Sequence, residues 1–252
     1  MHPRGFEPML ATARGQLEGD GWAYDLKLDG WRAVVHVGAS GLAVFSRPGR
    51  DIAGALPRLQ ALTEVMPVGT VLDGELVAGD GRASSFYRLA TLMATRPDRR
   101  PGRVTFVAFD VLALDGRRTT ARPYRERRQL LEGLECFGPA WCTSRCWTGV
   151  DVGDLLAACD GLDIEGVVAK RLDSPYRPGQ RSRDWVKIKT PAWRTEHGPY
   201  RHEHDRGARA AGGQTGGSVA WAPAVAALPL SLPPISAGPS TRRSERELSR
   251  RG

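Results

Sequence analysis

The sequence predicts an α+β protein whose core is built from antiparallel β-sheets flanked by a few helices. Short runs rich in Val, Leu and aromatic residues are separated by glycine turns, which is typical of antiparallel strands. These runs do not alternate regularly with helices, as they would in a doubly wound parallel sheet. The 252 residues, 41% of them hydrophobic and 25% charged, suit one sizeable soluble domain or two small ones.

Each element follows from local pattern. The strands that we predict from apolar and β-branched runs cover residues 22–28, 31–37, 42–47, 70–77, 103–114, 165–171 and 184–189. Asp29-Gly30 and residues 38–41 are turn signals, so we expect the first three strands to form one antiparallel meander. The helices that we predict cover residues 84–95, 124–134 and 151–159, with Pro123 at the first helical position of the second.

The composition changes after Thr190. Residues 207–240 are mostly Gly, Ala, Pro and Ser, and such a segment cannot bury enough apolar surface to offset the entropy lost on ordering. Residues 241–252 are charged and rich in arginine. We therefore predict a folded domain over residues 1–194 and a disordered tail over residues 195–252.

Charge and apolar content restrict the function classes. The net charge is +8, and residues 191–252 contribute +4 of it from nine arginines and five acids, which favours a polyanionic partner. No stretch approaches the roughly 20 apolar residues of a membrane span. Residues 1–7 lack a signal-peptide pattern, so we expect no membrane partner and a cytoplasmic, nucleoid-associated protein. Cys142 and Cys146 have a spacing that a metal can use, but we favour buried free thiols for all four cysteines.

The scarcity of lysine indicates that the few lysines present have a chemical role. Only four of the 36 basic residues are lysines, namely Lys27, Lys170, Lys187 and Lys189. Arginine stays charged, whereas a lysine amine can lose its proton and act as a nucleophile. Lys27 lies at the end of a predicted strand, beside a glycine turn that lets a phosphate approach the backbone. A hairpin with ordinary surface charges is the alternative interpretation of this segment.

Other segments carry candidate binding residues. Glu75 follows a tight turn within an apolar strand, where it suits a ribose hydroxyl or simply faces solvent. Phe109 suits a purine, a stacking contact worth roughly 1–3 kcal/mol, or the core. Glu165 suits Mg²⁺, which usually takes one or two carboxylates together with substrate phosphates. Lys187 and Lys189 alternate along a strand, so they share one face and can clamp a phosphate.

In this order the motifs resemble the covalent nucleotidyltransferases, which include DNA ligases, RNA ligases and mRNA capping enzymes. The likeness is greatest to bacterial ATP-dependent DNA ligases, including the ligase (adenylation) domain of DNA ligase D, and covers about residues 6–194. The segments that carry it are Lys27-Leu-Asp29-Gly30, Phe45-Ser-Arg47, Asp73-Gly-Glu75, Phe109-Asp110, Arg122–Arg128, Glu165-Gly166, Asp173-Ser-Pro-Tyr176 and Lys187-Ile-Lys189. The resemblance implies an ATP-grasp-like nucleotidyltransferase core.

The resemblance also implies roles for these residues. Lys27 would form lysyl-AMP from ATP and pass the AMP to the 5′-phosphate of nicked or broken double-stranded DNA, in company with other DNA-repair proteins. Asp29 would support Lys27, and Mg²⁺ or Mn²⁺ would bind at Glu165 and Glu75. The residues that would contact the nucleotide, with Arg32 or Arg47 also serving the DNA 5′-phosphate, are Asp25, Arg32, Arg47, Glu75, Phe109, Lys187 and Lys189.

Two features depart from the family pattern. Asp25 stands where the family usually has Glu, and it is shorter by one methylene. The family core is normally followed by an OB-fold domain, and the 63 residues after Lys189 do not have the pattern of a five-stranded barrel. The alternatives are therefore an RNA ligase, a capping-type nucleotidyltransferase, or a non-catalytic nucleic-acid-binding remnant of a ligase.

Overall fold

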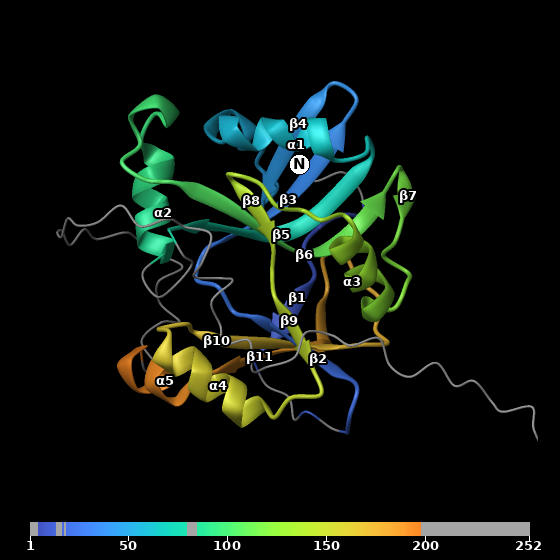
Figure 1. Cartoon of the computed structure of the whole chain (residues 1–252), viewed down its shortest axis with the longest axis vertical. Coiled ribbons are helices and arrows are strands. Elements are labelled where there is room, and N and C mark those ends of the chain that lie inside the picture. Colours follow the sequence, from blue (N-terminus) through green and yellow to red (C-terminus); the bar gives the residue numbers. More distant parts are fainter. Residues whose placement is uncertain (1–4, 14–16, 18, 80–84, 198–252) are drawn as a thin grey trace, which may run out of the picture.

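Two β-sheets form the framework of the protein (Figure 1). The computed structural model describes residues 5–13, 17, 19–79 and 85–197. Ser84 and most of the predicted tail, residues 198–252, lie outside the described residues. Residues 195–197, which we placed in the tail, instead belong to a helix that begins at Pro191.

The elements follow one another as strands interrupted by short helices. The strands are β1 (Leu10–Thr12), β2 (Trp22–Leu26), β3 (Trp31–Gly38), β4 (Gly41–Ser46), β5 (Thr70–Ala78), β6 (Val104–Leu114), β7 (Arg117–Arg118), β8 (Trp141–Thr143), β9 (Cys146–Thr148), β10 (Gly166–Arg171) and β11 (Arg181–Lys189). The α-helices are α1 (Leu62–Val65), α2 (Ser85–Ala94), α3 (Tyr124–Gly133), α4 (Val152–Gly161) and α5 (Pro191–His197). The 3₁₀ helices are η1 (Ala53–Ala55), η2 (Pro57–Ala61) and η3 (Pro97–Arg99).

The first three predicted strands do not form one meander. β2 pairs with β9 and β10 in the five-stranded sheet β1-β11-β10-β2-β9, whereas β3 pairs with β4 and β5 in the sheet β4-β3-β5-β6-β7. Asp29-Gly30 is therefore a crossing between sheets and not a hairpin turn. A Cβ on Gly30 would lie 2.1 Å from the Leu76 carbonyl oxygen, so the crossing requires a glycine. Local pattern could not distinguish these two uses of a glycine.

The predicted strands and helices are present, and most of their pairings are antiparallel, as expected. Two pairings are parallel, β1 with β11 and β6 with β8. The short strands β1, β7, β8 and β9 and the helices between β4 and β5 were missed, because each is too short to show a period. Pro123, which we predicted at the first helical position, is instead the N-cap residue of α3, whose first helical residue is Tyr124.

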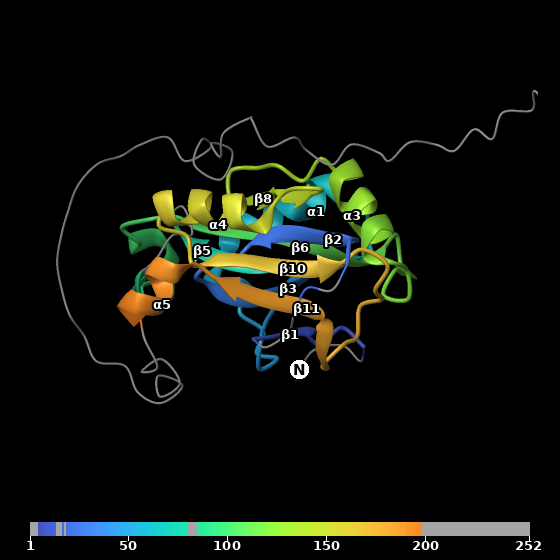
Figure 2. The ribbon, with the colours of Figure 1, turned by 90° about the horizontal axis from the view of Figure 1, so that it is seen from below.

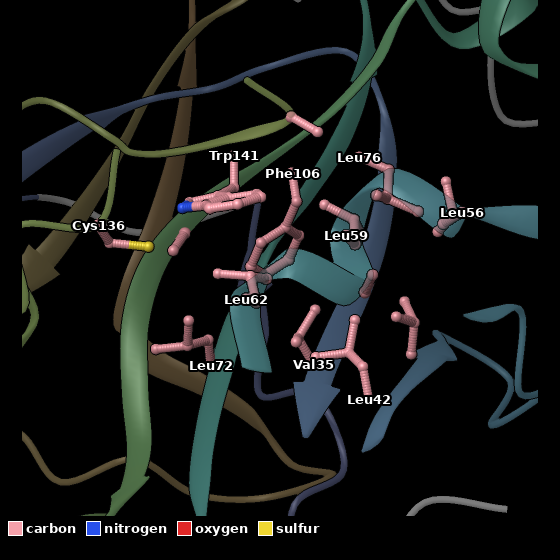
Figure 3. Close-up of a cluster of buried hydrophobic side chains, with 14 of the residues drawn as sticks. Val35, Leu42, Leu56, Leu59, Leu62, Leu72, Leu76, Phe106, Cys136 and Trp141 are labelled. Atoms are coloured by element: carbon pink, nitrogen blue, oxygen red, sulfur yellow. The ribbon is translucent and has the colours of Figure 1, made fainter. Parts of the chain in front are cut away.

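Hydrophobic clusters hold the two sheets and their helices together. In the largest one, η2 and α1 place Leu59 and Leu62 against Leu72 and Phe106 of β5 and β6 (Figure 3). A second cluster packs α4 against β2 and β10, and these elements lie together in the view from below (Figure 2). A third contains Val34 and Leu112 of one sheet and Trp185 of the other. This third cluster joins the two sheets, and the candidate site lies beside it.

Candidate active site

A cavity of about 530 Å³ opens between the two sheets. This volume is within the range of about 300–1,000 Å³ that is typical of small-molecule sites. Seven of the predicted site residues line it, namely Asp25, Lys27, Arg32, Arg47, Glu75, Phe109 and Lys187. Asp29, Glu165 and Lys189 lie just outside its lining. Lys170, Ser144, Phe86 and Trp185 also line the cavity, although we assigned none of them to the site.

Lys27 lies directly after β2, where the chain leaves the five-stranded sheet. Its backbone N–H donates to the Gly166 carbonyl at 2.8 Å, which fixes Lys27 beside the start of β10. Gly166 itself has φ +144°, and a Cβ there would lie 2.1 Å from the Ile188 carbonyl oxygen. Glycine at this position therefore allows the Lys27 segment, β10 and β11 to approach one another closely.

The Lys27 ammonium group is half-buried and bonded to a carboxylate. Its Nζ pairs with Oε2 of Glu165, and the other oxygen, Oε1, pairs with Lys189 Nζ at 2.8 Å. Glu165 is buried, and although burial alone would raise its pKa, the two ammonium groups hold that pKa below its ordinary value. Glu165 thus holds two of the four lysines together at the edge of the cavity.

Lys187 and Lys189 follow the alternation expected along β11. They pair with Val168 and Gly166 of β10, two residues apart on the same strand. Lys187 lines the cavity, while Lys189 lies outside its lining, against Glu165. Partial burial and the charge of Lys27 lower the pKa of Lys187 to about 8. An ammonium group that is short of counter-charge is well placed to receive a phosphate.

Arg32 is held by a buried carboxylate on the neighbouring strand. Its Nε and Nη2 atoms both donate to Asp73 at 2.6 Å, and the Tyr176 hydroxyl donates to the same carboxylate at 2.6 Å. The Arg32 guanidinium carbon lies 4.5 Å from the ring centre of Phe109. Phe109 is half-buried, so it both lines the cavity and packs with Trp185 in the inter-sheet core. The binding and core interpretations of Phe109 therefore both hold in part.

Lys170, the fourth lysine, is buried in a box of aromatic rings. Its Nζ lies 2.5 Å from Oδ2 of Asp25 and 4.3 Å from the ring centres of Phe109 and Trp185. The Tyr124 hydroxyl also donates to Oδ2, at 2.9 Å. The other oxygen, Oδ1, has longer contacts, 3.5 Å to the Ser144 hydroxyl and 3.7 Å to an Arg128 nitrogen. Asp25, Ser144 and Lys170 all line the cavity, so this charged network forms part of its wall.

Asp29 belongs to the strand crossing, and the side chain of Glu75 lies beside Gly30 of the same crossing. Glu75 lines the cavity rather than facing open solvent, and burial raises its pKa to about 7, against the opposing charges of Arg32 and Lys27. Asp29 is buried, and its Oδ2 accepts a hydrogen bond from the Phe86 backbone N–H at 3.4 Å. Asp29 thereby ties the segment of Lys27 to the start of α2.

The cysteines and the other possible metal ligands bear on whether the protein holds a metal ion. All four cysteines are free and buried, as expected, and burial raises the pKa of the thiols of Cys142 and Cys146 to about 12. Within the described ranges, no group of three or more His, Cys, Asp or Glu side chains lies close enough to hold a metal ion. No helix of the described part is long and apolar enough to cross a membrane.

The lysine count was the strongest signal in the sequence. Three of the four lysines line the cavity, and the fourth is joined to Lys27 through Glu165. Sequence reasoning singled out Lys170 but assigned it no role. Ser144 and Trp185 gave no signal, because a single Ser or a Trp within a strand has many ordinary uses. Phe86 was hidden within a helical pattern.

Comparisons with known proteins identify relatives of this chain. Residues 8–189 match the model of the ATP dependent DNA ligase domain family. The multifunctional non-homologous end joining protein LigD of Mycolicibacterium smegmatis is 36% identical over 207 residues, which are 77% of this chain and 25% of that protein. DNA ligase C1 of the same organism is 34% identical over 200 residues, 73% of this chain and 56% of that protein. The chain thus spans about a quarter of the length of the LigD protein that it matches.

Solved structures show the same fold. The ligase domain of LigD from M. tuberculosis superimposes with a TM-score of 0.60 and 36% identity, covering 73% of this chain and 60% of that one. A mycobacterial DNA ligase D complexed with ATP and MES gives a TM-score of 0.59 and 37% identity, with the same coverage. Chlorella virus DNA ligase-adenylate, at 19% identity and a TM-score of 0.53, shares the fold over 73% of this chain and 68% of that one.

Proposed function

Because the chain belongs to the family of ATP-dependent DNA ligase domains, we propose that it is an adenylating core that activates the 5′-phosphate of broken DNA through lysyl-AMP. The observation that carries this proposal is the convergence of all four lysines on one cavity, with Lys27 at its edge. A protein that otherwise uses arginine for its cations has lysine where a nucleophilic amine and compact phosphate contacts are needed.

In the first step, Lys27 gives up a proton to solvent and its neutral amine attacks the α-phosphorus of ATP. A bond forms between nitrogen and phosphorus, and the bond to pyrophosphate breaks. Glu165 orients the Lys27 side chain, since it contacts Nζ directly. Lys187 neutralises charge on the phosphate oxygens from the cavity wall. Covalent catalysis of this kind divides one difficult condensation into easier displacements.

In the second step, an oxygen of the DNA 5′-phosphate attacks the same phosphorus and Lys27 leaves. In the third, the 3′-hydroxyl attacks the activated phosphate and AMP leaves. Arg47 and Arg32 both line the cavity and supply cations for these phosphates. Arg32 is also bonded to Asp73.

Adenosine recognition rests on three side chains of the cavity. Glu75, in its ionised form, accepts hydrogen bonds from the ribose hydroxyls, and Phe109 offers a ring face to the base. Oδ1 of Asp25 has only long hydrogen-bond contacts, so it can accept from the exocyclic amino group of adenine. Guanine presents a carbonyl oxygen at that edge, which would face the carboxylate as a second acceptor. This chemistry favours ATP over GTP.

A divalent cation fits the cavity at Glu75 better than at Glu165. Burial raises the pKa of Glu75 to about 7, so a hard cation such as Mg²⁺ or Mn²⁺ beside it would stabilise the ionised carboxylate. Both oxygens of Glu165 are already bonded to ammonium groups, so a cation there would replace one of them. When bound, the ion would polarise the phosphate oxygens of the nucleotide.

Labelling with ATP tests the central claim. The chain incubated with α-labelled ATP should retain acid-labile AMP through denaturing electrophoresis, and Lys27→Arg should abolish the label while keeping the charge. Equal labelling of the Lys27→Arg variant would remove Lys27 from the mechanism. Labelled GTP in place of ATP distinguishes the capping-type alternative, and nicked RNA in place of nicked DNA distinguishes an RNA ligase. A folded chain that accepts neither nucleotide would be the non-catalytic remnant.

A further inference from the structure

The net positive charge of the core is concentrated in one short segment. Residues 1–190 contain 27 Lys and Arg and 23 Asp and Glu, a net charge of +4. Residues 85–103 contain five arginines and one acid, which is the same net charge. The remaining residues up to 190 have 22 charges of each sign. By count, the excess positive charge of the core therefore lies in residues 85–103, which include α2 and the turn that follows it.

This segment starts at the candidate active site. Phe86, in the first turn of α2, lines the cavity, and its backbone N–H is held by Asp29. The ten residues of α2 extend away from the cavity for about 15 Å. The helix borders β5 at one side of the molecule, and η3 follows at its far end (Figure 1). The charged segment thus begins beside the cavity and extends away from it.

Four of the five arginines, Arg88, Arg96, Arg99 and Arg103, are exposed, and we call them the arginine face. The backbone N–H of Gly79 donates to the Arg103 carbonyl at 3.5 Å, and a Cβ on Gly79 would lie 3.3 Å from Nη1 of Arg88. Arg88 and the Arg103 backbone therefore meet beside Gly79, at the end of β5.

The fifth arginine, Arg100, fixes the turn that carries Arg96 and Arg99. Arg100 points inward and donates to the carbonyl oxygens of Ala55 at 2.5 Å and Thr95 at 3.1 Å. Arg96 and Arg99 lie on the 3₁₀ turn that Arg100 anchors to η1. The only acid of the segment, Asp98, lies 3.6 Å from Arg96, and both side chains are well exposed. An exposed pair of this kind contributes little and is readily exchanged for a phosphate.

We propose that the arginine face binds the phosphate backbone of duplex DNA beside the break, an inference that rests on the proposed function. Duplex DNA carries one charge per roughly 1.7 Å of its axis, so a strip about 15 Å long spans several phosphates. Exposed guanidinium groups bind phosphate oxygens in a bidentate manner and require no apolar interface. A duplex along α2 would reach the cavity at Phe86, which lines it.

The test compares two variants of the full chain with equal charge loss. The first replaces Arg88, Arg96, Arg99 and Arg103 by Gln. The control replaces four exposed arginines elsewhere, Arg58, Arg117, Arg122 and Arg125, by Gln. The affinity of each protein for nicked duplex DNA is measured at several salt concentrations, and self-adenylation with labelled ATP is measured without DNA. Self-adenylation needs no DNA, so it reports separately on the proposed function.

The arginine-face variant should bind nicked DNA at least about tenfold more weakly near 0.1 M salt. Its slope of log K against log salt should fall by up to about 0.9 for each lost contact, roughly three units or more in total. The control should change the slope by less than about one unit, and both variants should form lysyl-AMP at the parent rate. Equal affinity and slope in the two variants would overturn the proposal, whether both stay unchanged or both fall. If the fourfold variant loses self-adenylation, the Arg96/Arg99 pair, farther from the cavity, is replaced alone, and an unchanged slope would overturn the proposal.

Discussion

The buried Lys170–Asp25 pair allows a stability prediction of useful size. Lys170 is 2% exposed, and its ammonium group has one carboxylate partner and three aromatic rings within 4.8 Å. Lys170→Met keeps the length and apolar contacts of the side chain but removes the charge. Asp25 is left buried without its ammonium partner. Breaking a buried ion pair on one side costs about 3–5 kcal/mol. We expect a loss at the lower end of that range, because Arg128 lies 3.7 Å from Oδ1 of Asp25 and still offsets part of its charge.

A loss of this size in the free energy of unfolding can be measured by thermal and urea unfolding. A domain of this size loses roughly 2–4 °C in Tm for each kcal/mol, so Lys170→Met should lower the Tm by about 10 °C. Urea unfolding should show a lower midpoint at an unchanged m-value. The double variant Asp25→Asn with Lys170→Met removes both charges, and it should recover about half or more of the lost free energy. The hydrogen bond from Tyr124 to Asp25 can then be made to the Asn carbonyl oxygen.

Two outcomes would refute this reasoning. If Lys170→Met is as stable as the parent, the ammonium group is not the partner that compensates Asp25. If the double variant is less stable than Lys170→Met, the destabilisation comes from lost packing in the aromatic box and not from an unpaired carboxylate. ATP-dependent labelling of the double variant, measured on folded protein, separates stability from base recognition.

Two further predictions follow from shifted pKa values. The pKa of Lys187 is lowered to about 8 from an ordinary value of 10.5, so Lys187 loses its charge as the pH rises through about 8. In a Lys27→Arg background, which keeps the charge that lowers the pKa of Lys187 but cannot be adenylated, ATP affinity measured by calorimetry should therefore weaken above about pH 8. The added change Lys187→Arg should extend binding to higher pH, and a parallel decline in both proteins would exclude Lys187 as the phosphate contact. The pKa of Glu75 is raised from 4.5 to about 7, so the folded state binds more protons than the unfolded state between these values and Glu75 lowers stability as the pH rises through that window. Glu75→Gln should remove this part of the pH dependence of Tm between about pH 4.5 and 7, and an unchanged profile would mean that Glu75 is not the group responsible.

The sequence alone determined the class of fold, and it named most of the candidate site residues that the structure brings to the cavity. Strand and helix positions followed from runs of apolar residues, since period and length are local properties of the chain. Lys27, Glu75 and Phe109 were identified from their motifs, and the scarcity of lysine marked Lys170 as unusual before its surroundings were known. The roles assigned to these residues stay predictions.

The tertiary structure decided which residues meet. Asp29-Gly30 has the local pattern of a hairpin turn, and only the pairing of β2 with β10 and of β3 with β5 makes it a crossing between sheets. Glu165 and Lys27 are 138 residues apart, and nothing near either one indicates that they form an ion pair. The aromatic box around Lys170 joins residues from β6, β11 and α3. Contacts of this kind depend on how the sheets pair and pack, and that is a property of the whole chain, which a short window of sequence does not contain.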